Sequence, residues 1–163
     1  MRELQTILTV AVSRLAADTE LAAFAEVISE DKGNIDNEIM KTVATLKKVS
    51  VLVMIRSAST DSPNAAGPVI DDAEIFVEVA ENVLLNRKKD GVSGEDYLTA
   101  LDVAQIVAST DSGLHQFIDE TTGVSFLAES SGPFLKPSPP PPGATTAYTL
   151  YFKTTGVVTG NDD

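Results

Sequence analysis

Several residue types are absent or scarce in this chain of 163 residues, and each absence removes a class of function. There is no cysteine, so disulfide bonds, thiolate catalysis and metal sites built on sulfur are excluded. There is no tryptophan, and the single histidine, His115, excludes any metal site that needs two histidines. No apolar run approaches the ~18 residues that a membrane-spanning helix needs.

Positive charge is also scarce. The 12 lysines and arginines face 24 acidic residues, which gives a net charge of −12 and a pI near 4.4. An acidic surface repels phosphate, so direct binding to nucleic acid is disfavoured. The last 73 residues carry 2 basic and 9 acidic residues. This excess is typical of a solvated acidic face, or of a surface that must not stick to a polyanion passing close by.

The remaining composition predicts one folded domain. Hydrophobic residues make up 43% of the chain, too many for a disordered acidic protein, and the length suits a single domain. Glu3 and the Ser13-Arg14 pair interrupt the pattern of a secretory signal, so we expect a protein made and used without export. Apolar residues instead recur at helical spacing near the start, and the predicted buried face consists of Leu4, Ile7, Leu8, Ala11 and Leu15.

Strand and turn signals follow this helix. We expect a short strand within residues 24–30, then a second helix that begins at Asp36 and buries Ile39, Val43 and Leu46. Residues 49–55 (VSVLVMI) predict the strongest strand, buried on both faces at the centre of a sheet. After a polar loop over residues 57–68, residues 71–80 predict a strand with Ile75, Val77 and Val79 on one face. The two strands would form a wide hairpin.

The second half of the chain predicts one helix and two strands. Ser93 or Gly94 is expected to cap a helix over residues 95–109. Its expected buried residues are Tyr97 or Leu98, Leu101, Ala104 or Gln105, and Ala108. The strands are expected within residues 123–128 and 147–153. Residues 132–143 (GPFLKPSPPPPG) lie between them and, being rich in proline, should not join a sheet ladder.

These elements predict a single α+β domain with a mainly antiparallel sheet of four to five strands and helices packed on one face. The core would comprise residues 1–131 and a C-terminal strand within residues 144–158. Residues 132–143 would form a loop or arm that matters more for assembly than for folding, and residues 159–163 a flexible tail.

Motifs for chemistry are missing from the sequence: there is no phosphate loop, dinucleotide fingerprint, HExxH motif or GxSxG elbow. Asp71 and Asp72 are expected to be solvated, the alternatives being paired carboxylates or a Ca²⁺ site shared with Asp61. His115 follows a predicted helix end, where a surface position is more typical than the base of a Ser-His-Asp triad. We therefore expect no catalytic residue, no metal and no cofactor.

Three segments are candidates for contacts with other proteins. The proline run predicts a rigid spacer or an arm over a neighbour, or else a ligand for an SH3-type domain. Asn82 and Asn86 flank an apolar segment, where they could cap the chain as it leaves the strand or contact another subunit. Tyr148 and Tyr151, in the last strand, are expected to pack or to face a partner.

The middle of the chain resembles the small tail-completion, or tail terminator-like, proteins of tailed bacteriophages and prophages. The resemblance covers roughly residues 36–115. It consists of the strand VSVLVMI, a loop ending in PNAAGP (residues 63–68), the segment DDAEIFVEVAENVLLNR and a helix after Gly91. Its more distinctive parts are the P-N-x-x-G-P and E-N-x-x-x-N-R patterns, and the proline-rich C-terminal segment departs from the family.

The resemblance implies a non-enzymatic virion protein, assembled in the host cytoplasm, that forms a homo-oligomeric ring, commonly a hexamer. Such a ring caps the tail tube protein, joins it to the neck or connector protein, and lets DNA pass through its lumen without specific binding. The alternatives are a neck or head–tail adaptor, another component of a tail-like particle and, in a different class, a small hydrolase or ligand-binding domain. The residues expected at interfaces are Pro63, Asn64, Gly67, Pro68, Asn82, Asn86, Arg87, Pro139, Pro140, Tyr148 and Tyr151.

Overall fold

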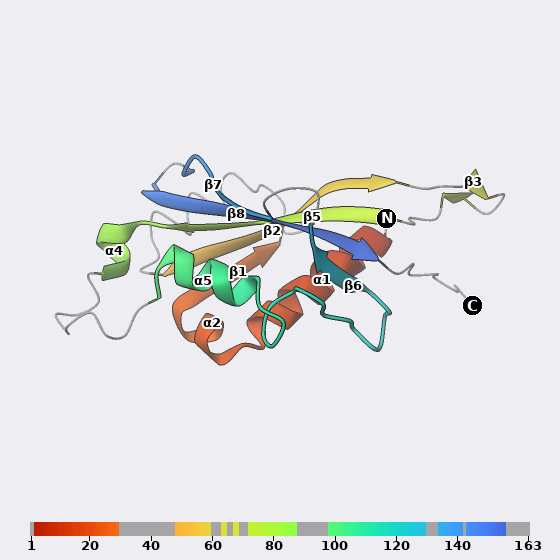
Figure 1. Cartoon of the computed structure of the whole chain (residues 1–163), viewed down its shortest axis with the longest axis horizontal. Helices are drawn as coiled ribbons and strands as arrows, with labels where there is room; N and C mark the ends of the chain where they lie inside the picture. The colour runs from red at the N-terminus through yellow and green to blue at the C-terminus, as the bar shows by residue number, and fades with distance from the viewer. Residues whose placement is uncertain are drawn as a thin grey trace.

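The computed structural model describes residues 2–29, 48–59, 63–64, 67–68, 72–87, 98–129, 134–141 and 143–155. The helix expected to begin at Asp36 and the tail at residues 159–163 lie outside these ranges, as do Asp61 and Asp71. Within them, helices pack against a mixed, mostly antiparallel sheet, which confirms the predicted α+β class (Figure 1).

The N-terminal region follows the predicted order of helix and short strand. Helix α1 (Arg2–Ala16) buries four of the five expected residues: Ile7, Leu8, Ala11 and Leu15. Asp18 caps the next helix, α2 (Thr19–Phe24), because its carboxylate accepts a hydrogen bond of 2.9 Å from the amide of Leu21. Helix α2 was not predicted, but it leads into β1 (Ala25–Ser29), the short strand expected within residues 24–30.

Six strands form the main sheet in the order β1-β2-β5-β8-β6, with β7 also paired to β8. β1 runs parallel to β2, and the other pairs are antiparallel. The hairpin predicted between the two central strands is therefore confirmed, and the sheet has more strands than the four to five expected. The remaining strand bounds are β2 (Val49–Ser59), β5 (Asp72–Glu81), β6 (Ser125–Ala128), β7 (Leu135–Pro137) and β8 (Thr146–Thr155).

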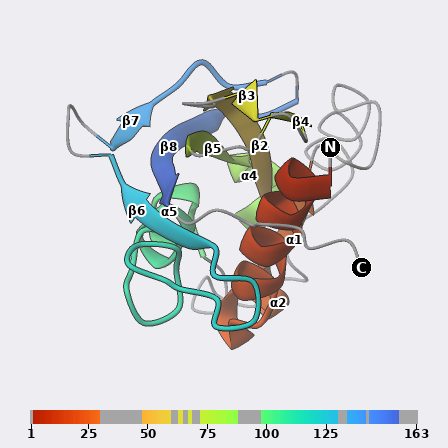
Figure 2. The same ribbon diagram turned by 90° about the vertical axis from the view of Figure 1, so that its right-hand side faces the viewer.

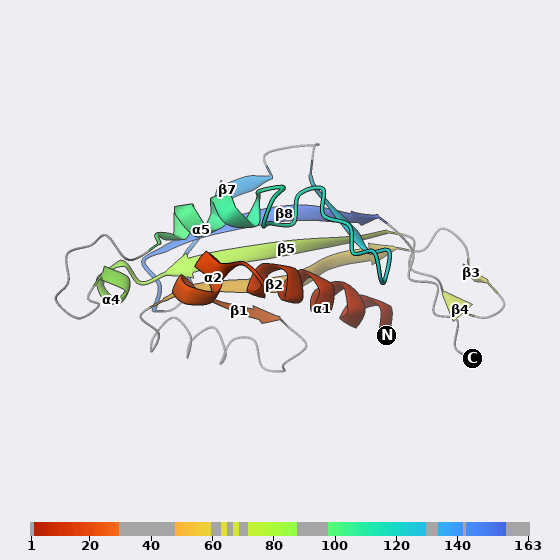
Figure 3. The ribbon, with the colours of Figure 1, turned by 90° about the horizontal axis from the view of Figure 1, so that it is seen from below.

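One face of the sheet carries the core. Alternate residues of β5, namely Ile75, Val77 and Val79, point to this face and are buried, as predicted. Helices α1, α2 and α5 (Ala100–Val107) cover it, so that all three lie in front of the strands when the molecule is seen from below (Figure 3). The opposite face, named here the Tyr151 face, carries Phe76 and Tyr151, which are paired across β5 and β8.

Helix α5 begins later than predicted. Its cap is Thr99, not Ser93 or Gly94, and the hydroxyl of Thr99 accepts a hydrogen bond from the Asp102 amide at 3.1 Å. The Asp102 carboxylate in turn accepts one from the Thr99 amide at 2.9 Å, which completes a capping box. The buried face also differs from the expected one: Leu101 is 42% exposed, and the buried residues are Ala100, Val103, Ala104 and Val107.

The expectation that the proline-rich segment stays out of the sheet is wrong. β7 pairs Leu135, Lys136 and Pro137 with Leu150, Thr149 and Tyr148 of β8. Proline fits here because the ladder bonds on either side come from the amide of Tyr151 to the Phe134 carbonyl and from the amide of Ser138 to the Ala147 carbonyl. In that register the nitrogen of Pro137 faces away from β8, so its missing N–H removes no ladder bond.

The segment predicted as a loop over residues 57–68 is partly strand. β2 continues to Ser59 after a register shift between Ile55 and Ser57, and β3 (Pro63–Asn64) pairs with β4 (Gly67–Pro68). We name β3, β4 and the strand ends 56–59 and 72–74 the hairpin arm. The arm ends at one extreme of the long axis, and Figure 2 looks onto that end of the molecule.

Candidate interface

Most of the residues predicted at interfaces lie at two opposite ends of the sheet. Pro63, Asn64, Gly67 and Pro68 form the short ladder of β3 and β4 in the hairpin arm. Asn82 leads into α4 (Val83–Arg87), which lies at the other end of the long axis in two views (Figures 1 and 3). The predicted set therefore does not form one continuous surface.

Asn82 organises the end of the molecule that carries α4. Its side-chain oxygen accepts hydrogen bonds from the amides of Leu84 at 3.1 Å and Leu85 at 3.2 Å, so it caps the helix. Its side-chain nitrogen donates to the carbonyl of Gly143 at 2.8 Å, which ties the end of the proline-rich segment to α4. Both roles favour the capping interpretation of Asn82.

Apolar surface is exposed at this end. Leu84 is 68% exposed, the most of the large hydrophobic side chains described. Pro139 and Pro140 are also exposed and lie between β7 and Gly143. We name Leu84, Pro139 and Pro140, with the rest of α4, the α4 end.

Asn86 points inwards rather than to a partner. It is 2% exposed and donates to the Glu81 carboxylate at 2.7 Å and to the Leu98 carbonyl at 2.8 Å. Glu81, itself 5% exposed, also accepts a hydrogen bond of 3.0 Å from the amide of Ala100. Sequence reasoning missed Glu81, although it continues the inward alternation of Val77 and Val79 and is therefore an acidic residue at a core position.

The two tyrosines of β8 lie on opposite faces of the sheet. Tyr148 packs against the hydrophobic core. Tyr151 lies on the other face, where the Arg56 guanidinium is 4.8 Å and the Lys136 ammonium 5.1 Å from the centre of its ring. Arg56 also pairs with the Glu129 carboxylate at 3.3 Å and with that of Glu74 at 3.6 Å.

We name these side chains the Tyr151 patch: Tyr151, Arg56, Lys136, Glu74, Glu129 and Lys153, the last opposite Glu74 in the strand register. The side chain of Arg56 is 46% exposed, so the patch reaches solvent. It combines an aromatic ring with three cations and two carboxylates. Its three cations outnumber its two carboxylates by one, and the half-buried carboxyl of Glu78 lies on the same face.

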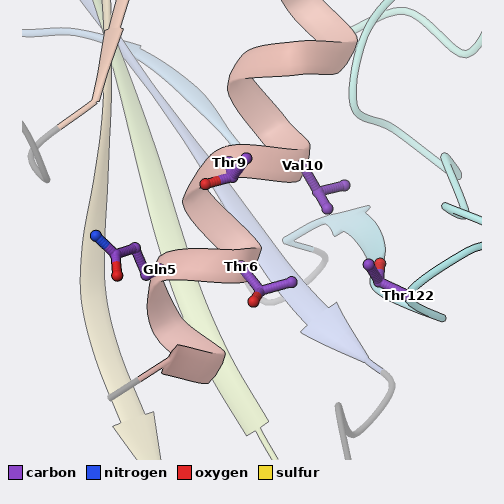
Figure 4. Close-up of a pocket in the computed structure, with 5 residues that line it drawn as sticks. All are labelled: Gln5, Thr6, Thr9, Val10 and Thr122. Carbon is purple, nitrogen blue, oxygen red and sulfur yellow. The ribbon is translucent and has the colours of Figure 1, made fainter. Parts of the chain in front are cut away.

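Of the open grooves that the described residues form on the helical side, two are the larger. One, of about 410 Å³, runs between α2 and α5 and has an acidic rim of Glu20, Asp102 and Asp111 over the apolar side chains Leu98 and Ile106. The other, of about 420 Å³, is lined by Gln5, Thr6, Thr9, Val10 and Thr122 (Figure 4). In that second groove Thr6 and Val10 lie on the side of α1 towards Thr122, whereas Gln5 and Thr9 lie on the other side. Its lining residues carry no charge that would orient a ligand.

Two carboxylates have shifted pKa values. Burial raises the pKa of Glu78, which lies half-buried on the Tyr151 face opposite Leu52 and Thr149. Hydrogen bonds from the side chain and the amide of Thr122 lower the pKa of Asp119. These two groups lie on different elements and form no acid–base pair.

His115, the candidate for a catalytic base, makes a hydrogen bond within the fold. The Nδ1 atom of His115 accepts a hydrogen bond of 3.1 Å from the amide of Ala128, which fixes the ring against the end of β6. Within the described ranges no three histidine, aspartate or glutamate side chains gather as a metal-binding group. In the same part of the chain no helix is long and apolar enough to cross a membrane.

The chain matches no known protein-family model. No curated protein matches it either. The function proposed below therefore depends on the sequence pattern and on the geometry of the fold.

Proposed function

We propose that this chain is a structural subunit of a phage tail: a tail terminator-like protein that forms a ring on the end of the tail tube and joins the tube to the neck. The proposal starts from the sequence resemblance over residues 36–115. Much of that stretch consists of β2, the hairpin arm, β5 and α4. These are the elements that reach the two ends of the molecule.

The observation that carries the proposal is the placement of the hairpin arm and the α4 end. β2 and β5 are strands of 11 and 10 residues that run through the body and connect these two ends. A protein that joins two structures needs two separate contact surfaces, and here they lie at opposite extremes of the long axis (Figure 1). One end would contact the tail tube and the other the neck.

The charge of the chain agrees with this role. DNA that passes through a ring must slide rather than bind, and a net charge of −12 leaves the condensed counterions on the DNA. Of the residues considered for catalysis, His115 has a local partner, the Ala128 amide.

The test is deletion of the gene in the phage or prophage that carries it, followed by electron microscopy of the particles. We expect filled heads without tails, together with tail tubes of uncontrolled length. Tubes of normal length beside unattached heads would instead indicate a neck adaptor. Intact tailed particles assembled without the chain would contradict both roles.

Complementation with variants sharpens the test. Leu84→Ser removes the exposed apolar side chain from the α4 end and should fold normally but fail to restore joined particles. Ile118→Ser is the matched control, because Ile118 is 62% exposed and lies away from the α4 end, beside Ser125 of β6. Restoration by both variants would show that the α4 end makes no essential contact.

A further inference from the structure

The two sides of this domain differ in charge. The Tyr151 patch holds Arg56, Lys136 and Lys153 against Glu74 and Glu129, and it lies on the face of the sheet opposite α1, α2 and α5. Of the five lysines and arginines whose side chains the structure describes, three belong to this patch.

The groove between α2 and α5 has the opposite character. Its rim carries Glu20, Asp102 and Asp111, and Leu98 and Ile106 provide apolar surface inside it. The nearby cation Arg14 is already engaged, since its guanidinium donates to the backbone carbonyls of Gly113 and Asp111 and lies 4.5 Å from the centre of the Phe117 ring. Arg14 keeps its positive charge, so the groove region holds the three carboxylates of its rim against one cation and is net negative.

We propose that the Tyr151 patch of one copy docks on the α2–α5 groove of a second copy, and that this is the lateral contact of the assembly. The proposal rests on the proposed function and deepens it, because it names the surfaces that neighbouring subunits use. Opposite charges would meet across the contact, while an aromatic ring and apolar groove residues would supply its centre. The β3–β4 ladder and helix α4 stay free for the tube and the neck, whereas Arg56 and Glu74 of the hairpin arm take part in the lateral contact.

The symmetry of the contact follows from the charges. A groove facing a second groove would bring carboxylates together, which disfavours a two-fold dimer through that surface. Patch against groove joins two different surfaces on opposite sides of the sheet. Such a head-to-tail contact closes into a ring when the rotation between copies permits it.

The patch is also organised before it binds. Arg56 and Lys136 both make cation–π contacts with the Tyr151 ring. The carboxylates of Glu74 and Glu129 hold the Arg56 guanidinium in place. Side chains that are already ordered lose little conformational freedom on association, which favours a contact at this position.

The experiment is a charge exchange on the full chain, with self-association measured by sedimentation velocity. Lys136→Glu alone and Asp111→Lys alone should each weaken self-association by about tenfold or more, because each brings like charges together. The double variant should also associate more weakly than the parent chain, because the patch then carries net negative charge and no longer faces a groove of opposite sign. The matched controls are Lys48→Glu and Glu120→Lys, which make the same charge changes outside both surfaces and should associate like the parent chain.

Salt gives an independent readout. Raising NaCl from about 0.1 M to about 1 M shortens the screening length from about 10 Å to about 3 Å and should weaken association of the parent chain. Thermal melting of every variant shows whether it is folded before its association is compared.

Three results would overturn the contact. One is unchanged association in both single variants. Another is a double variant that associates as strongly as the parent chain. The third is a parent chain that stays monomeric at every concentration. The first two results leave the proposed function standing, whereas a strictly monomeric chain would also count against the proposed ring. The particles formed without the gene test the proposed function separately.

Discussion

Asn86 donates a hydrogen bond of 2.7 Å to the carboxylate of Glu81, and both side chains are buried. The same carboxylate accepts a hydrogen bond from the amide of Ala100, the first residue of α5. The end of β5, helix α4 and the start of α5 are thus joined through one buried acidic group. This junction supports the α4 end, which the proposed function places against another virion protein.

Asn86→Ala should destabilise the fold through this junction. The substitution removes a donor from a buried carboxylate, and a hydrogen bond to a charged group contributes about 1.5–3 kcal/mol to the free energy of unfolding. Chemical denaturation measures the loss. Leu84→Ala, two positions earlier on the exposed side of α4, is the control and should change the free energy of unfolding by less than about 0.5 kcal/mol. Equal effects of the two substitutions would show that the Asn86–Glu81 bond is not what holds α4.

Gly113 and Gly123 should differ in their tolerance of alanine. A Cβ atom at Gly113 would lie 2.3 Å from the carbonyl oxygens of both Ile106 and Val107, so the end of α5 would have to move. We expect Gly113→Ala to cost about 3 kcal/mol or more, at the upper end of overpacking effects. At Gly123 there is open space, and the positive φ of 74° alone should cost about 1 kcal/mol. Thermal melting of the two variants side by side tests the difference. A melting temperature of Gly113→Ala as high as that of Gly123→Ala would contradict it.

The stability of the fold should depend on pH through Glu78. Because burial raises the pKa of this carboxyl in the folded state, ionised Glu78 costs stability at neutral pH. That cost disappears as the pH falls through the raised pKa, and it is fully gone below the ordinary glutamate pKa of the unfolded chain. Glu78→Gln should therefore raise Tm at pH 7.

The gain from Glu78→Gln should be under about 1 kcal/mol, because solvent screens a side chain that is only half-buried. The gain should shrink towards zero in acid, where Glu78 of the parent chain is protonated and, like glutamine, carries no charge. Glu120→Gln, in an exposed turn, is the control and should change Tm little at either pH. A gain that persists unchanged in acid would assign the effect to packing and not to ionisation.

Deletion of residues 132–143 should damage folding as well as assembly, contrary to the expectation from the sequence. The deletion removes β7, and with it the ladder that pairs Leu135–Pro137 with β8. We expect a broader melt at a lower temperature. Pro139→Ser combined with Pro140→Ser changes exposed positions beyond the end of β7 and should leave the melt nearly unchanged. A cooperative melt of the deletion at the parent temperature would show that β7 contributes nothing to the fold.

The local sequence pattern predicts the sheet and the helices that cover it, but not the features that depend on contacts between residues far apart in the sequence. The alternation of Ile75, Val77 and Val79 predicts a strand with one buried face, and burial of these side chains confirms it. The start of α5 was missed because the capping pattern at Thr99 competes with a similar one at Ser93. A residue 19 positions away, Glu81, favours the later start by binding the Ala100 amide.

The candidate interface shows the same limit. That Pro137 can join a ladder depends on the register of β7 against β8, which no local signal gives. The contact of Arg56 with Tyr151 likewise depends on three strands lying side by side, since these residues are 95 positions apart in the sequence. The sequence could therefore point to Tyr151 as a residue that packs or faces a partner, but not to the cations around it.

The measurement that tests the ring most directly is the mass of the purified chain by light scattering after size-exclusion chromatography, over a range of loading concentrations. The account predicts one discrete species near six times the chain mass of 17.2 kDa, with a mass that does not grow further as concentration rises. A strict monomer at every concentration, or a mass that increases without limit, would contradict a closed ring.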